Sequence, residues 1–145
     1  MKYTNLAGLA LVLAAPAAVP AQDTAAQKIK DPFVCVTQES HVCTLYEGCR
    51  TLHPVEMNTP DFWRFDLDKK EITARRHDGS YGTIRIASEK RLPKMLMLQG
   101  VMESSDNFPE GVAWSIGVHT DTGRMSISAS VHAEVIAMLG SCHSL

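Results

Sequence analysis

The sequence lacks the short motifs that identify common hydrolases and metalloproteins. It has no GxSxG turn to expose a nucleophilic serine, and its six histidines include no HExxH arrangement. Three of them, His77, His119 and His143, fall at expected turns or near the terminus, where a solvated histidine is ordinary. We therefore expect a protein with no enzymatic activity, no metal ion and no cofactor.

Strong charge and long apolar segments are also missing. The 14 lysines and arginines nearly balance the 16 aspartates and glutamates, which leaves a formal net charge of −2. So mild a charge gives no reason to expect nucleic acid or a strongly anionic membrane as the partner. An apolar run at residues 6–15 is too short to span a bilayer and no other is long enough, so no transmembrane segment is predicted.

The first 21 residues have the pattern of a cleaved signal peptide. Lys2 supplies the positive end, an apolar run follows, and Ala21 is the small residue expected before the cleavage site. This predicts a periplasmic or secreted protein. Residues 22–31 are polar and contain alanine, and we expect a flexible lead-in there, before a single disulfide-bonded β domain over residues 32–145.

The four cysteines all lie in the predicted mature chain, where export would place them in an oxidising compartment. Two disulfides allow three connectivities. We favour Cys35 with Cys142 and Cys43 with Cys49, because this joins the first strand to the last and closes one local loop. A zinc site with a nearby histidine is the alternative, but the cysteine spacings do not fit the usual close ligand pairs.

The clearest element is a β-hairpin over residues 111–131, where apolar and small polar residues alternate with period two. A slip of one residue would send the apolar side chains of one strand to the wrong face, so parity predicts the register. It places Val118 opposite Met125 and Trp114 opposite Ala129, with a left-handed glycine closing the loop.

A second hairpin is predicted around a turn that ends in a left-handed Gly79. This register sets Ile72 opposite Ile84 on the buried side and Arg75 opposite Tyr81 on the outer side. Favourable cross-strand pairs appear together, which supports the register.

The rest of the chain is less regular. Two short strands are expected at residues 33–37 and 41–46, joined by a turn, and residues 47–60 form an irregular stretch of a kind that is often functional. Residues 133–142 favour helix by composition. We predict a strand there, because Cys142 must return to an early cysteine.

Residues 94–103 are apolar on both faces of a predicted strand. Such a strand is covered on both sides or lines a ligand cavity, and methionine suits an adaptable binding surface. The possible cavity lining consists of Trp63, Met95, Met97 and Trp114.

These elements predict an all-β fold, an antiparallel meander of eight or nine strands closing into a small barrel, with a two-sheet β-sandwich as the alternative. The plan resembles that of the lysozyme inhibitors of the Gram-negative periplasm in its signal peptide, early Cys35, late Cys142 and meander. The resemblance concerns architecture alone, and no residue of their inhibitory loop is carried over.

One basic group is the most asymmetric surface feature and a possible partner surface. Its members are Lys69, Lys70, Arg75, Arg76 and Tyr81. A solvated hairpin end, partly neutralised by nearby acids, is the simpler interpretation.

Our first functional hypothesis is a non-enzymatic binding protein of the cell envelope, inhibitor-like or holding an envelope protein or glycan through the loops at 47–60 and 104–110 or the basic group. The alternative is a lipocalin-like carrier of a small apolar ligand. A filled barrel favours the first hypothesis, and an apolar cavity open at one end favours the second.

Overall fold

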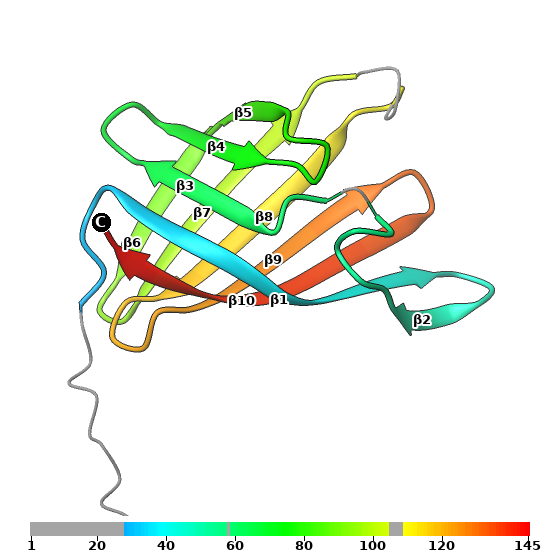
Figure 1. Ribbon diagram of the computed structural model, residues 1–145, viewed down its shortest axis with the longest axis horizontal. Coiled ribbons are helices and arrows are strands. Elements are labelled where there is room, and N and C mark those ends of the chain that lie inside the picture. Colours follow the sequence, from blue (N-terminus) through cyan, green and yellow to red (C-terminus); the bar gives the residue numbers. More distant parts are fainter. Residues whose placement is uncertain (1–27, 58, 105–108) are drawn as a thin grey trace, which may run out of the picture.

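The computed structural model describes residues 28–57, 59–104 and 109–145, which form one antiparallel sheet without helices (Figure 1). The predicted signal peptide and the first part of the lead-in lie outside these residues. The strands are β1 (Phe33–Thr44), β2 (Gly48–Thr51), β3 (Phe62–Asp66), β4 (Glu71–Arg75), β5 (Tyr81–Arg85), β6 (Ser88–Leu92), β7 (Met95–Met102), β8 (Val112–His119), β9 (Arg124–Val131) and β10 (Glu134–Ser144).

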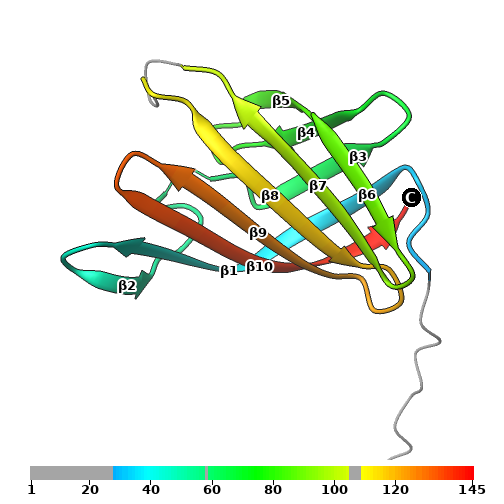
Figure 2. The same cartoon turned by 180° about the vertical axis from the view of Figure 1, so that it is seen from behind.

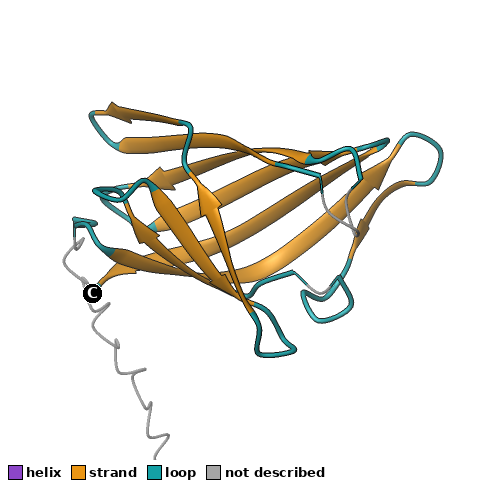
Figure 3. Cartoon of the chain, turned by 90° about the horizontal axis from the view of Figure 1, so that it is seen from above, coloured by secondary structure: helices purple, strands orange, loops and turns teal. Residues whose placement is uncertain are grey.

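The order across the sheet is β5-β4-β3-β1-β10-β9-β8-β7-β6, with β2 paired to β1 outside this path. The first and last strands are therefore neighbours in the middle of the sheet. Figures 2 and 3 show the sheet curled into an open half-barrel, with β3, β4 and β5 facing the long strands β7 to β9 across the interior. The predicted all-β antiparallel class is confirmed. The strands form one continuous sheet that curls into an open half-barrel, whereas the prediction was a sheet closing into a small barrel.

The two edges of the sheet are joined at one corner by the short connection between β5 and β6. There the Ile86 N–H donates to the carbonyl of Lys70 at 2.9 Å, and the Ala87 N–H donates to the carbonyl of Gln99 at 2.9 Å. The chain thus passes from the edge beside β4 to the edge beside β7. This crossing holds the curled sheet together at that corner.

The prediction of two strands at 33–37 and 41–46 is wrong, because β1 is one strand with a bulge. Thr37 pairs with Gly140 and Glu39 with Leu139, so Gln38 is an extra residue without a partner on β10. A bulge of this kind reverses the alternation of side chains. Before the bulge the odd residues up to Thr37 are buried, whereas after it the even residues Ser40 and Val42 are buried. In the sequence, this change of parity looks the same as a turn between two strands.

Both predicted hairpin registers are confirmed. Val118 pairs with Met125 and Trp114 with Ala129 in the β8–β9 hairpin, and its loop glycine, Gly123, has a φ of 68°. The β4–β5 hairpin likewise shows every predicted pair, and its turn glycine has a φ of 83°. The strand predicted at residues 133–142 is also present, as part of β10.

The disulfides join Cys35 to Cys142 and Cys43 to Cys49, the connectivity favoured from the sequence. The first links paired positions of β1 and β10 in the core, and both of its cysteines are fully buried. The second closes the β1–β2 hairpin, which extends beyond the rest of the sheet (Figure 1). Disulfides form and persist in oxidising compartments, so the two bridges indicate such an environment.

One end of the half-barrel is filled with closely packed side chains. Phe33 and Phe65 stack there with ring centroids 4.6 Å apart, beside the buried disulfide, Leu96 and Val118. Within the described ranges no helix is long and apolar enough to cross a membrane.

Candidate ligand-binding cavity

The other end of the half-barrel contains a cavity of about 200 Å³. On β8 its lining runs from Val112 to Ile116 but does not reach Val118, and on β10 it includes Ile136 and Met138. The cavity thus occupies the half of the barrel at the start of β8, and the stacked phenylalanines do not line it. Its other lining residues are Met57, Thr59, Pro60, Trp63, Ile72, Ala74, Arg76, Gly82, Thr83, Ile84, Met102, Trp114, Ile127, Ala129 and Val131.

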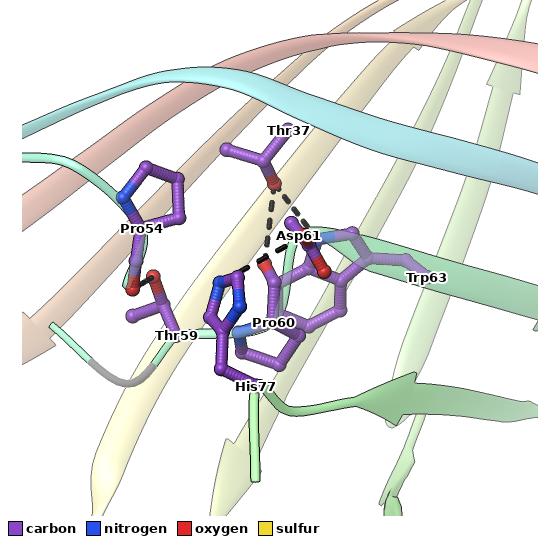
Figure 4. Close-up of polar contacts among 7 residues, drawn as sticks. All are labelled: Thr37, Pro54, Thr59, Pro60, Asp61, Trp63 and His77. Atoms are coloured by element: carbon purple, nitrogen blue, oxygen red, sulfur yellow. Dashed lines mark hydrogen bonds and ion pairs between the residues drawn. The ribbon is translucent and has the colours of Figure 1, made fainter. Parts of the chain in front are cut away.

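The irregular stretch before β3 forms part of the rim. Pro54 is buried, and its carbonyl accepts a hydrogen bond from Thr59 Oγ1 at 3.4 Å (Figure 4). The backbone N–H of Thr37 donates to the carbonyl of Asp61 at 2.8 Å, and Thr37 Oγ1 donates to the carbonyl of Pro60 at 3.4 Å. These contacts attach the rim loop to β1.

The two tryptophans line the cavity but differ in hydrogen bonding. Trp63 Nε1 donates to Thr37 Oγ1 at 2.9 Å. Trp114 is only 8% exposed, and its Nε1 is buried without a hydrogen-bond partner among the described residues. A buried unpaired donor costs about 1–3 kcal/mol. The cavity wall therefore includes an indole whose N–H is enclosed by protein and unpaired among the described residues.

Met95 and Met97 do not line the cavity, so that part of the prediction is wrong. In β7 the buried residues are Leu96 and Leu98, whereas Met95 is 38% exposed on the outer face. The strand is apolar on both faces, so its own pattern could not show which face is inside. Its register with β8 decides this, because Leu96 and Leu98 pair with buried residues there.

Arg76 lines the cavity, a position that the sequence analysis missed. Ile72 and Ala74 point inward from β4, and Arg76 follows in the same alternation. It is directly opposite Ser80, where its N–H donates to the Ser80 carbonyl at 2.9 Å. The inward position of Arg76 follows from the predicted register, since parity places residue 76 on the same face as residues 72 and 74.

The other residues of the basic group lie at opposite ends of β4, although Lys69 and Tyr81 border the same outer hollow. Lys69 and Lys70 lie at the β3–β4 turn, whereas Arg75 and Tyr81 pair at the far end of β4. Five residues of strand separate the two ends, about 16 Å at roughly 3.3 Å per residue. Lys69 also lies 2.9 Å from Asp66, and its hydrogen bond to that carboxylate lowers the pKa of Asp66.

Two histidines lie at the rim beside carboxylates. His77 Nε2 is 3.8 Å from Asp61 Oδ2 (Figure 4), and His132 Nδ1 is 2.9 Å from Glu110 Oε2. The hydrogen bond that His132 donates to Glu110 raises the pKa of His132. Neither pair belongs to a larger set, because the described residues contain no group of three or more histidines, cysteines or acids placed to hold a metal ion.

The arrangement is therefore a cavity with an apolar wall and one arginine at its edge. Among the described residues that line it, Arg76 is the only ionisable side chain. No protein-family model matches the chain, and no curated protein or solved structure is significantly similar to it.

Proposed function

We propose that the protein is a non-enzymatic, exported binding protein that holds a small apolar ligand inside its half-barrel, in the manner of a lipocalin-like carrier. The observation that supports this most strongly is the apolar cavity of about 200 Å³ at one end of the curled sheet. Ligand pockets are typically concave and apolar, with a few placed polar groups. The guanidinium of Arg76 is such a group.

The size of the cavity restricts the ligand. Pockets for drug-sized molecules have volumes of about 300–1,000 Å³, which is more than the 200 Å³ available here. The proposed ligand is therefore small, or inserts only its apolar end. The lining residues that the structure describes include no histidine or carboxylate to act as an acid or base, which favours binding over catalysis.

Tryptophan fluorescence provides a direct test, because both tryptophans of the chain line the cavity. We expect titration with 1-octanol, a neutral probe, to change the emission in a saturable way. Gly82→Val would place a side chain in the cavity where only Arg76 Nη2, at 3.8 Å from the added Cβ, is close. This variant should weaken octanol binding about tenfold, which corresponds to about 1.4 kcal/mol.

Ala113→Val is the matched control, because Ala113 is exposed on the outer face of β8. It adds similar volume outside the cavity and should leave the affinity for octanol unchanged. Emission that does not respond to octanol, or an equal loss of affinity in both variants, would contradict the proposal.

A second candidate function, contact with an envelope protein, is favoured by the tip of the β1–β2 hairpin. Leu45 and Tyr46 are 79% and 92% exposed there, and the Cys43–Cys49 disulfide holds the hairpin closed. A photo-crosslinking phenylalanine in place of Tyr46 should give one discrete adduct in the producing cell. The same group at Thr73, on the outer face of β4, is the control, and equal labelling from both positions would rule this function out.

A further inference from the structure

The side chain of Arg76 lies at the boundary between the apolar cavity and the surface. It follows Ile72 and Ala74 on the inner face, and its Nη2 is 3.8 Å from the position that a Cβ of Gly82 would occupy. Gly82 pairs with Ala74 across the β4–β5 hairpin. Two small residues therefore leave the guanidinium room to lie along the inner face of the sheet.

Arg76 has no ion-pair partner in the described part of the chain, where no carboxylate oxygen lies within 4.0 Å of it. The nearby acids have other contacts. Asp61 faces His77 at 3.8 Å, and Asp78 Oδ1 accepts the Ser80 N–H at 2.8 Å. The neighbouring Arg75 adds a second positive charge on the outer face. The half-buried guanidinium thus has several unused donors beside an apolar space.

The same arginine also borders an open hollow of about 550 Å³ on the outer face of the sheet. The hollow is lined by Val36, Asp61, Phe62, Arg75, Arg76, His77 and Tyr81. A molecule whose apolar end occupies the cavity could therefore place its other end beside the half-buried Arg76, whereas Arg75 does not line the cavity.

We propose that the ligand is a small amphiphile with an apolar body in the cavity and a single anionic group bound by Arg76. This inference rests on the proposed function and names the chemical class of its ligand. Arginine suits the task because its planar guanidinium presents paired N–H donors that match the oxygens of an anion such as a carboxylate. Charge-assisted hydrogen bonds of this kind are also stronger than neutral ones.

Two probes that differ only in the end group test the inference: octanoate, which is anionic, and 1-octanol, which is neutral. We expect the full-length mature protein to bind octanoate at least about tenfold more tightly than octanol. Arg76→Gln should abolish this difference by weakening octanoate alone. Arg75→Gln is the matched control, since it removes the same charge from the adjacent residue on the outer face, and it should preserve the difference.

The outcomes separate the two proposals. If neither probe changes the tryptophan emission, the proposed function is wrong and the ligand class is wrong with it. If octanol binds but octanoate binds no better, or if Arg75→Gln and Arg76→Gln reduce octanoate binding equally, only the inference about Arg76 is overturned. Thermal unfolding of each variant, expected within about 0.5 kcal/mol of the wild type, verifies that the variants remain folded.

Discussion

Trp63 Nε1 donates a buried hydrogen bond to Thr37 Oγ1 at 2.9 Å and so joins β3 to β1 at the rim of the cavity. Thr37 is the last inward residue before the β1 bulge, and it also binds the rim loop through the carbonyls of Pro60 and Asp61. One threonine thus holds a cavity wall and a rim loop together.

Thr37→Val should destabilise the protein by about 1–3 kcal/mol, because it leaves the buried indole N–H of Trp63 unpaired. Urea unfolding provides the measurement. Thr73→Val on the outer face of β4 is the matched control and should change the free energy of unfolding by no more than about 0.5 kcal/mol. Equal effects of the two substitutions would show that the bond to Trp63 contributes little.

The two disulfides should contribute unequally to stability. Cys35 and Cys142 are 107 residues apart, whereas Cys43 and Cys49 are 6 apart. Since loop closure entropy grows with loop length, replacing the first pair by alanine should cost about 5 kcal/mol and replacing the second about 2 kcal/mol. Chemical denaturation of the two double variants compares them, and the reverse order of stability would contradict this ranking.

Gly100 allows Trp114 to lie against β7. A Cβ on Gly100 would collide with the indole ring and would stand 2.8 Å from the carbonyl oxygen of Arg85. Gly100→Ala should therefore cost about 1–3 kcal/mol through overpacking, and it should shift the tryptophan emission. Gly117→Ala is the control, because its Cβ meets only movable side-chain atoms, Ser126 Oγ at 3.3 Å and Met95 Sδ at 4.0 Å. Unchanged emission and stability in Gly100→Ala would refute this account of the cavity wall.

The contact of His132 with Glu110 predicts a pH dependence at the rim. The folded pKa of His132 lies above its ordinary value of 6.5, chiefly through the hydrogen bond to Glu110. The stabilisation is therefore complete below about pH 6.5 and disappears as the pH rises through the raised pKa of the folded state. NMR titration should show that Glu110→Gln lowers this pKa more than Glu134→Gln does, because Glu134 has the smaller effect. A larger decrease of the His132 pKa in Glu134→Gln than in Glu110→Gln would contradict the contact between His132 and Glu110.

Local pattern predicted much of the fold. Alternation in two hairpins was enough to place partners such as Trp114 with Ala129, because parity leaves few registers when one face must be buried. The cysteines supplied the pairing of first and last strands, since only a returning strand could bring Cys142 to Cys35.

The bulge in β1 and the open shape of the sheet could not be predicted in the same way. Gln38 changes the parity within one strand, and a change of parity in the sequence looks the same as a turn. The connection through Ile86 and Ala87 depends on hydrogen bonds to Lys70 and Gln99, which are distant in sequence.

The cavity was predicted only in part. Trp63 and Trp114 line it, whereas Met95 and Met97 face outward. The sequence could not show this, because β7 is apolar on both faces. Arg76 was grouped with the surface cations by its charge, although its position two residues after Ala74 places it inside. The charge of Arg76 suggested a surface position, whereas its place in the alternation of β4 correctly indicates the inner face.

The proposed ligand occupies the half-barrel beside Trp114. Isotope-filtered NMR of the labelled protein saturated with unlabelled octanoate measures this directly, through nuclear Overhauser effects between the ligand and individual side chains. We predict effects from the octanoate chain to the indole of Trp114, Ile127 and Met138, which all line the cavity. Effects confined to exposed groups such as Leu45 and Val101 would contradict the claim.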